Sequence, residues 1–145
     1  MIREVSAPDI AVRNQRMQQV VQFEVKSRRS GGRDWAMDYF ENLKSTVNTA
    51  DVQYFALALR DKLYLWNLRR SHDEPIEVDV KRVLGDWNDL LADYEVISEA
   101  SLKLIYASWL SRLVHADPGE HGDLPRLLGG SGFLRTVRGG TVELN

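Results

Sequence analysis

Two apolar runs lie close together within residues 8–26, PDIAVRNQRMQQVVQFEVK. The first begins after Asp9, and the second, residues 20–26, is rich in β-branched and aromatic side chains, as is typical of a strand. The polar residues between the runs are few enough for a β-hairpin. With the turn at residues 16–17, facing residues have numbers that sum to 33, and Asp9 lies opposite Glu24. This register is an assumption, because a one-residue slip reverses every side chain.

The rest of the chain predicts further elements that alternate between helix and strand. In order, these are a helix over 34–48, strands over 53–59 and 62–67, a polar link over 69–75, amphipathic helices over 80–94 and 98–114, a long loop over 115–132, and an end over 133–144 that either forms a small hairpin around Gly139-Gly140 or frays. The order predicts an α/β (α+β) domain with a central mixed sheet flanked by helices. The four tryptophans, at positions 35, 66, 87 and 109, lie on apolar faces and are interpreted as packing residues.

Length and composition limit the class of protein. The chain has 145 residues, 43% of them hydrophobic and 28% charged, which is typical of one globular domain. It has no cysteine, so disulfides, thiolate nucleophiles and cysteine-ligated zinc are excluded. Its apolar runs are shorter than the roughly 20 residues of a membrane span, and its start lacks the apolar core of a signal peptide. We therefore expect a cytoplasmic protein with no membrane partner.

Charge is distributed unevenly along the chain. Residues 1–70 contain 12 basic and 8 acidic side chains, whereas residues 71–145 contain 7 and 13. The small formal net charge of −2 is therefore compatible with a basic face on the first half. Ordinary scatter of surface charge is the alternative interpretation.

The pattern Asp9 to Glu24-Val25-Lys26 has the composition of a phosphodiester-hydrolysing site. Side chains two residues apart in a strand share a face, so Glu24 and Lys26 project together. In the assumed register Asp9 joins them from the neighbouring strand. Mg²⁺ takes one or two carboxylates together with water and phosphate oxygens, and the Val25 carbonyl offers a further oxygen. A lysine beside the metal orients or deprotonates the attacking water and stabilises the transition state.

Simpler interpretations of the same residues remain open. Glu24 and Lys26 form an ordinary solvated ion pair in many strands, worth about 0–1 kcal/mol. Asp9 after a proline is a common turn or strand-edge residue. The position of the Glu-Val-Lys group at the end of a very apolar strand favours the functional interpretation.

Pro8-Asp9 followed by Glu24-Val25-Lys26 resembles the signature of the PD-(D/E)XK phosphodiesterase superfamily, which has the restriction-endonuclease-like fold. The resemblance covers roughly residues 8–67. It implies a mixed sheet with the acidic site at one edge, a helix after the Glu-x-Lys strand, and a further strand after that helix. It also implies that Asp9 and Glu24 are the metal ligands and that Lys26 positions or activates the attacking water.

The chain departs from the family pattern in two places, of which one is that the helix after the motif lacks the glutamine seen in some nuclease branches; the other lies before the Pro-Asp strand. Members usually carry a helix before the Pro-Asp strand, often with another glutamate near the metal, and only seven residues precede Pro8. Either the chain is truncated, or another segment replaces this helix, or the domain is a trimmed variant with weakened activity. On this basis we expect one domain over 1–145, with a nuclease-like core over 1–70 and a helical extension and C-terminal tail over 71–145.

Basic residues follow the motif directly. The candidates for phosphate contacts are Arg28, Arg29, Arg33 and Lys44, with Arg13 and Arg16 as possible additions. A solubilising loop is the alternative. A second polar cluster, His115, Asp117, Glu120, His121 and Asp123, matches no helical zinc spacing and is interpreted as a flexible loop.

The sequence thus predicts a nuclease that depends on Mg²⁺ or Mn²⁺ and acts on nucleic acid, with DNA as the expected substrate. The alternative is a catalytically weak or inactive module of the same fold, used for nucleic-acid binding or protein assembly. In that case the helices over 80–94 and 98–114 form a homodimer or bind a partner subunit.

Overall fold

The computed structural model describes residues 7–43, 52–69, 74–84, 97–122, 124–128 and 132–145. These residues form a six-stranded mixed sheet with the strand order β5-β4-β3-β2-β1-β6. The strands are β1 (Ile10–Arg13), β2 (Gln19–Val25), β3 (Tyr54–Ala58), β4 (Lys62–Asn67), β5 (Ile76–Asp79) and β6 (Thr141–Leu144). The helices are α1 (Arg33–Leu43), α2 (Val80–Leu84), α4 (Glu99–His115), η3 (Pro118–His121), α5 (Leu124–Leu127) and α6 (Gly132–Val137). The expected α/β domain with a mixed sheet and flanking helices is confirmed.

β1 and β2 form the expected antiparallel hairpin. Ile10 lies opposite Phe23, and the same register continues to Val12, so the facing residue numbers sum to 33 as predicted. Asp9 directly precedes β1, and continuing the register by one residue places it opposite Glu24. The hairpin therefore sets the position of both carboxylates.

The turn end of this hairpin departs from the regular register. The pairing shifts between Val12 and Arg13, which marks a β-bulge. The turn is closed by the Asn14 N–H, which donates to the Gln18 carbonyl at 2.9 Å, and Met17 adopts a positive φ of 62°. The irregularity is thus confined to the tip.

α1 connects β2 to β3, which run parallel. Antiparallel strands can be joined by a tight turn, but parallel neighbours need a crossover of this kind. The helix expected over 34–48 is confirmed as far as Leu43, and residues 44–48 lie outside the described residues. The helix and the further strand that the resemblance implies after the Glu-x-Lys strand are both present.

The strands expected over 53–59 and 62–67 are confirmed as the antiparallel pair β3 and β4. Every residue of β3 is buried, as its apolar composition predicts. β5, which pairs with β4 at one edge of the sheet, was not predicted from the sequence. Ile76 and Val78 alternate with two acidic residues there, but four residues give too short a pattern to separate from the following helix.

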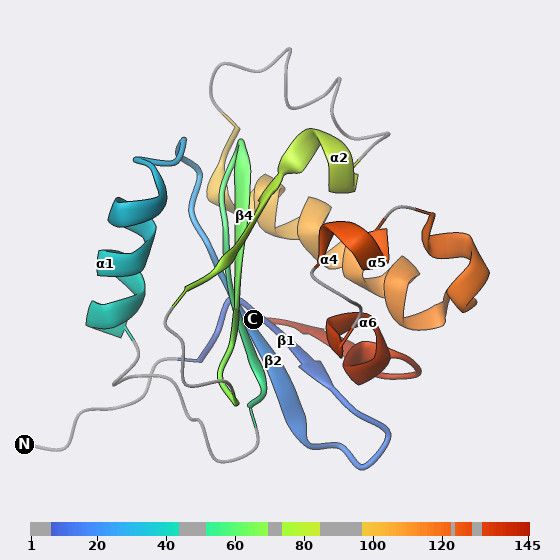
Figure 1. Cartoon of the computed structure of the whole chain (residues 1–145). Helices are drawn as coiled ribbons and strands as arrows, with labels where there is room; N and C mark the ends of the chain where they lie inside the picture. The colour runs from blue at the N-terminus through green and yellow to red at the C-terminus, as the bar shows by residue number, and fades with distance from the viewer. Residues whose placement is uncertain (1–6, 44–51, 70–73, 85–96, 123, 129–131) are drawn as a thin grey trace, which may run out of the picture.

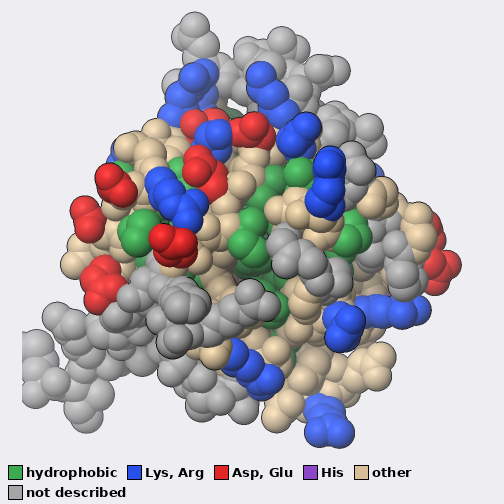
Figure 2. Space-filling model, in the orientation of Figure 1, with side chains coloured by type: hydrophobic (Ala, Val, Ile, Leu, Met, Phe, Trp, Pro, Cys, Tyr) green, Lys and Arg blue, Asp and Glu red, His purple; other side chains and the backbone are tan. Residues whose placement is uncertain are grey.

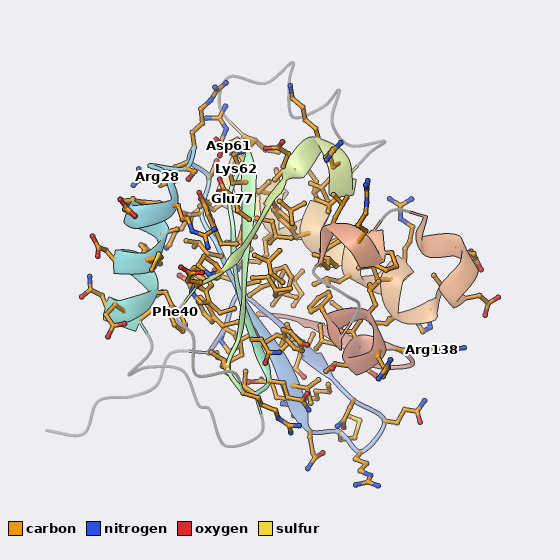
Figure 3. The ribbon with its side chains drawn as sticks, viewed as in Figure 1. Arg28, Phe40, Asp61, Lys62, Glu77 and Arg138 are labelled. Carbon is orange, nitrogen blue, oxygen red and sulfur yellow. The ribbon has the colours of Figure 1, made fainter. Side chains whose placement is uncertain are left out.

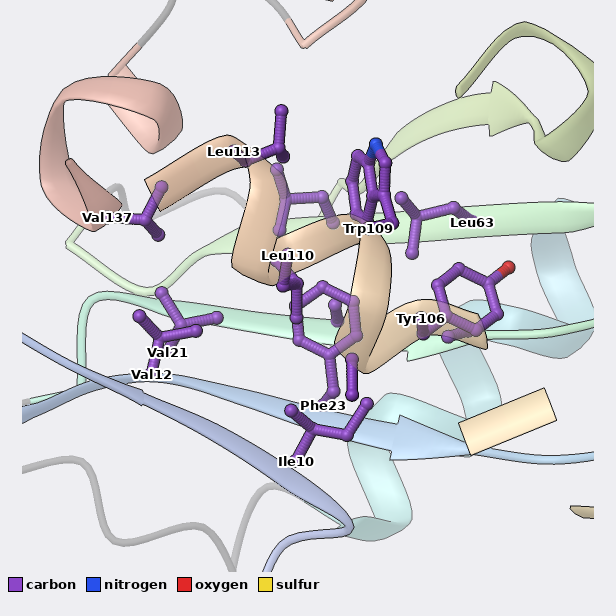
Figure 4. Close-up of a cluster of buried hydrophobic side chains, with 14 of the residues drawn as sticks. Ile10, Val12, Val21, Phe23, Leu63, Tyr106, Trp109, Leu110, Leu113 and Val137 are labelled. Carbon is purple, nitrogen blue, oxygen red and sulfur yellow. The ribbon is translucent and has the colours of Figure 1, made fainter. Parts of the chain in front are cut away.

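Helices cover both faces of the sheet (Figure 1), with α1 on one side and α4, α5 and α6 on the other. On the α4 side, Phe23 packs with Tyr106, and Leu110 is fully buried (Figure 4). On the α1 side, Phe40 stacks on Trp66 with ring centroids 4.5 Å apart. Each fully buried large apolar side chain contributes about 1.5–3 kcal/mol relative to exposure, so both layers hold the sheet.

The tryptophans support the packing interpretation where they are described. Trp66 and Trp109 are buried in the two layers. Trp35 is half-buried, and the Arg28 guanidinium lies over its ring at 4.3 Å. Trp87 lies outside the described residues.

The interpretation of residues 115–132 as a long loop is wrong. The segment contains the short helices η3 and α5. The Asp117 N–H donates to the Glu120 carboxylate at 3.2 Å at the start of η3, and Leu124 and Leu128 are buried. The alternation of glycines and prolines with single apolar residues hid these two short turns.

The prediction of a hairpin or frayed end over 133–144 is also wrong. The segment forms α6 and then β6, which pairs with β1. Phe133 and Val137 are buried at helical spacing, and Gly139 has a φ of +71° directly after the helix, which glycine adopts without strain. At Gly140 an added Cβ would lie 2.4 Å from a backbone carbonyl oxygen of β1, so the pair Gly139-Gly140 ends a helix instead of turning a hairpin.

The remaining helices agree with the prediction as far as they are described. α2 begins the helix expected over 80–94, of which residues 85–94 lie outside the described residues. α4 confirms the helix over 98–114, and the Ser98 hydroxyl caps it by accepting the Ser101 N–H at 3.1 Å. The sheet takes β5 and β6 from the second half of the chain. None of the described helices is long and apolar enough to cross a membrane.

Candidate active site

Asp9 is fixed at the start of β1 by the neighbouring strand. Its Oδ2 accepts the Val25 N–H at 2.8 Å, so a side chain replaces a main-chain carbonyl at the end of the hairpin. Its own carbonyl accepts the Asn145 N–H at 3.0 Å. The carboxylate is 27% exposed. Asp9 is therefore held rigidly against the end of β2 while one side remains open to solvent.

Glu24 and Lys26 share a face at the end of β2, as strand alternation requires. The Lys26 Nζ lies 3.4 Å from the Glu24 Oε1. The Lys26 N–H donates to the Ala58 carbonyl at 3.1 Å, which fixes the backbone here against β3. The structure thus brings together Asp9, Glu24 and Lys26, the three residues predicted to carry the chemistry.

α4 adds two residues that the sequence analysis did not assign to the site. The Lys103 Nζ lies 3.3 Å from the Asp9 Oδ1, and the Glu99 Oε1 lies 4.0 Å from the Lys26 Nζ. The two residues are four apart and so lie on one face of the helix. The Glu-x-x-x-Lys spacing was visible in the sequence, but only the tertiary packing shows where this face points.

Burial and like charge act together on Glu24. Burial raises the pKa of Glu24, and the negative charge of Asp9 raises it further; Lys26 opposes both effects without cancelling them. Burial also raises the pKa of Tyr39, on α1, and the Glu24 carboxylate adds to this. The two carboxylates are therefore close enough to repel each other in a partly desolvated site, which is the setting that favours a bound cation.

Lys26 keeps its proton at neutral pH. Burial lowers the pKa of Lys26, but the Glu24 carboxylate, Tyr39 and Glu99 raise it by more, so that the net change is upward. A protonated lysine has no lone pair to accept a proton from water. The electrostatics therefore favour Lys26 as a donor that orients water and balances charge over Lys26 as a general base.

The donor set fits a magnesium or manganese ion. Asp9 and Glu24 supply hard oxygen ligands, and Val25 has a buried side chain, so only its backbone carbonyl is a candidate ligand. Within the described residues there is no group of three or more His, Cys, Asp or Glu side chains that could hold a metal ion. Mg²⁺ usually keeps several waters and needs only one or two carboxylates, so the pair is sufficient.

The loop that follows β2, residues 27–32, carries Arg28 and Arg29 and is called the arginine loop; it is hydrogen-bonded to the turn between β3 and β4. The Ser30 N–H donates to the Asp61 Oδ1 at 2.8 Å, and the Ser30 hydroxyl lies 2.5 Å from the Tyr64 hydroxyl. The Arg60 N–H donates to the Arg28 carbonyl at 3.0 Å. Figure 3 shows Arg28 above α1, near the Asp61–Lys62 turn. The loop is thus anchored by its backbone and by Ser30, while Arg28 and Arg29 are exposed.

Of the predicted phosphate contacts, Arg28 and Arg29 lie on this loop and Arg33 begins α1. Arg28 and Arg29 are exposed, and Arg28 stacks on Trp35. The Arg33 Nη2 lies 3.8 Å from the Glu74 carboxylate, a solvent-exposed pair. Lys44 lies outside the described residues.

The other polar candidates do not form part of the cluster of Asp9, Glu24 and Lys26. The Arg13 Nε donates to the Glu143 carboxylate at 2.8 Å, so its charge is matched within the sheet. Among the residues 115–123 that were considered as metal ligands, Asp117 and Glu120 are engaged at the start of η3. The side chains of His121 and Asp123 lie outside the described residues.

Comparison of the sequence with protein-family models, with curated proteins and with solved structures finds no match. The function is therefore argued from the geometry of the site.

Replacing Glu24 with glutamine is expected to stabilise the fold at neutral pH. Because the folded-state pKa of Glu24 is raised, the charged form costs stability above that pKa, and this cost vanishes below the unfolded value of about 4.3. Thermal melting should show Glu24→Gln unfolding a few degrees above the parent at pH 7–8 and at about the parent temperature at pH 4. Glu99→Gln, at a carboxylate that is 55% exposed, should shift less. A lower melting temperature for Glu24→Gln at pH 7 would contradict the repulsion.

Proposed function

We propose that the chain is a metal-dependent nuclease that hydrolyses phosphodiester bonds in DNA. The observation that supports this is the convergence of Asp9, Glu24 and Lys26 from adjacent strands at one end of the sheet. The resemblance of the same residues to the PD-(D/E)XK signature supports the substrate class. In this proposal Asp9 and Glu24 hold Mg²⁺ or Mn²⁺ together with the Val25 carbonyl.

Each residue of the cluster has a separate task. The Val25 N–H orients the Asp9 carboxylate, and the burial of Glu24 strengthens its attraction for a cation. The Lys26 ammonium donates hydrogen bonds to the attacking water and offsets the negative charge that develops on the phosphate oxygens. A bound Mg²⁺ supplies Lewis-acid polarisation of the phosphate and acidifies a coordinated water.

α4 supplies the helical glutamate that the resemblance associates with a helix before the Pro-Asp strand. Glu99 follows the motif in the sequence but lies beside Lys26 in space. This supports the interpretation that another segment replaces the leading helix. Lys103, on the same face, forms an ion pair with Asp9.

One observation favours the alternative of a catalytically weak or inactive module. Both carboxylate oxygens of Asp9 are already engaged, Oδ2 by the Val25 N–H and Oδ1 by Lys103. The Lys103 Nζ also donates to the Asn145 carbonyl at 2.7 Å, so this ammonium is held in place. A metal ion therefore competes with Lys103 for Asp9. The nuclease proposal requires that the metal ion displaces the Lys103 ammonium from the Asp9 carboxylate.

Metal-dependent cleavage and melting separate the two candidates. With about 10 mM MgCl₂ or MnCl₂, the parent protein should cut plasmid or duplex DNA and unfold at a higher temperature than in EDTA. RNA of the same sequence serves as the comparison substrate. The double variant Asp9→Asn, Glu24→Gln should show neither effect. Absence of cleavage and of a metal-dependent shift in the parent, together with a concentration-dependent mass, would support the assembly module instead.

A further inference from the structure

An open polar groove lies at the opposite end of the β1–β2 hairpin from the active-site cluster. Its volume is about 780 Å³, and it is lined by the hairpin turn, the end of α4 and the segment from α6 to Gly139. The residues that give the groove its charge are Arg16, Arg135, Arg138 and Asp117. Figure 3 shows Arg138 beside α6, far from the arginine loop that carries Arg28.

The groove has an excess of positive charge that the described protein does not neutralise. Three guanidinium groups face one carboxylate, which leaves a formal charge of +2 with His115 neutral. Among the described residues no ion pair joins Arg16, Arg135 or Arg138 to a carboxylate. Figure 2 shows one face of the molecule. Along the lower edge of this view, the charged side chains of the described residues are basic and none is acidic. Unmatched arginines in a hollow are suited to paired hydrogen bonds with phosphate.

The backbone that carries these arginines is held from several sides. The Asn14 Oδ1 accepts the Arg16 N–H at 2.9 Å and the Gln18 N–H at 3.0 Å, which fixes the hairpin turn. The Gly139 N–H donates to the Val114 carbonyl at 2.8 Å, and this joins the end of α6 to the end of α4. Gly139 also lies close to the Gln15 side chain of the turn, because a Cβ added at Gly139 would be 2.4 Å from the Gln15 Nε2. The groove is therefore preformed and does not require folding around a ligand.

The groove and the active-site cluster are joined by β2. This strand has seven residues, and at about 3.3 Å per residue its ends are roughly 20 Å apart. Phosphates along one strand of B-DNA advance about 3.4 Å per base pair, so this separation corresponds to about six base pairs.

We propose that this groove binds the phosphate backbone of a nucleic acid whose scissile bond lies at Asp9, Glu24 and Lys26. The choice of a polynucleotide over a small anion rests on the proposed nuclease function, and the groove itself rests on the unmatched arginines. Contacts of this kind fix the position of the duplex and do not read its sequence. The arginines are binding residues and take no part in the chemistry.

The test is the salt dependence of DNA binding measured without cleavage. A fluorescent 20-base-pair duplex is titrated with three proteins, all in EDTA. They are the parent, a double variant that carries both Arg135→Gln and Arg138→Gln, and the control variant Arg126→Gln. Arg126 is an exposed arginine on α5 that does not line the groove. The double variant should bind about 10-fold or more weakly in 0.1 M salt, and its slope of log affinity against log salt should be about 2 smaller. All three proteins should melt at the same temperature.

Each outcome separates this proposal from the nuclease proposal. A parent that binds the duplex but never cuts it, with binding lost in the double variant, supports the groove and contradicts only the nuclease function. Equal duplex binding by the parent and the double variant, or no duplex binding by the parent, overturns the groove. Calorimetry with inorganic phosphate is the last measurement. If the double variant loses phosphate binding but binds the duplex as the parent does, the groove is a small-anion site and the proposal is overturned.

Discussion

Replacing Lys26 with methionine is expected to lower the rate of DNA cleavage by about 10²–10⁴-fold. Methionine is unbranched like lysine and shorter by the nitrogen atom alone, so it removes the ammonium that lies 3.4 Å from the Glu24 carboxylate. In the proposed mechanism this ammonium orients water and offsets charge only as the reaction proceeds, so the loss should fall on kcat rather than on DNA binding.

The same variant should keep its metal-dependent stabilisation. Asp9 and Glu24 remain in place, and removing a neighbouring positive charge strengthens their attraction for a cation. The measurements are single-turnover cleavage and melting with and without about 10 mM MgCl₂. Lys81→Met, at an exposed lysine of α2, is the matched control and should cleave like the parent. A Lys26→Met protein that cleaves at the parent rate would remove this residue from the mechanism.

Two leucine-to-alanine substitutions on one helix should differ sharply in their effect on stability. Leu110 is fully buried in the layer between α4 and the sheet, whereas Leu104 is 55% exposed on the same helix. Leu110→Ala should lower the free energy of unfolding by about 2–5 kcal/mol, because it removes buried contacts and leaves a cavity. This is a large fraction of the roughly 5–15 kcal/mol that stabilises a typical domain.

Leu104→Ala provides the control, since helix propensity and chemistry change equally in both variants. Its effect should stay within about 0.5 kcal/mol. Urea denaturation measures both values, with equal slopes required for a direct comparison. Similar losses at the two positions would mean that α4 does not pack against the sheet as described.

The hairpin that carries the site was predictable because its pairing is local. The large apolar residues of β1 and β2 all lie in the core layer under α4, and this condition together with a short turn leaves little freedom in the register. The numbers of Ile10 and Phe23 sum to 33 for this reason. Asp9, Glu24 and Lys26 could therefore be placed together from the sequence.

The contribution of α4 to the site was not predictable in the same way. Glu99 and Lys103 reach the cluster through packing between segments more than 70 residues apart in the sequence. The apolar spacing of α4 predicts which of its faces is buried, but not which strand end lies beside its first turns. Long-range contacts of this kind leave no local pattern.

Short edge elements were the other source of error. β5 and β6 have four residues each and lie at the two edges of the sheet. Four residues span only two alternations, which are easily hidden by an adjoining helix or glycine pair. The groove at the hairpin tip was missed as well, because residues 133–144 were expected to form a hairpin or to fray.

The bulge between Val12 and Arg13 divides the hairpin into a turn end and a site end with different registers. Lengthening or shortening the turn changes the offset on the tip side of the bulge, while the ladder from Val12 back to Ile10 keeps its pairing. Related sequences with tips of different length would therefore retain the same spacing between the two acidic side chains. If the proposed functions hold, changes in the tip alter how nucleic acid is bound and leave the distance between Asp9 and Glu24 unchanged.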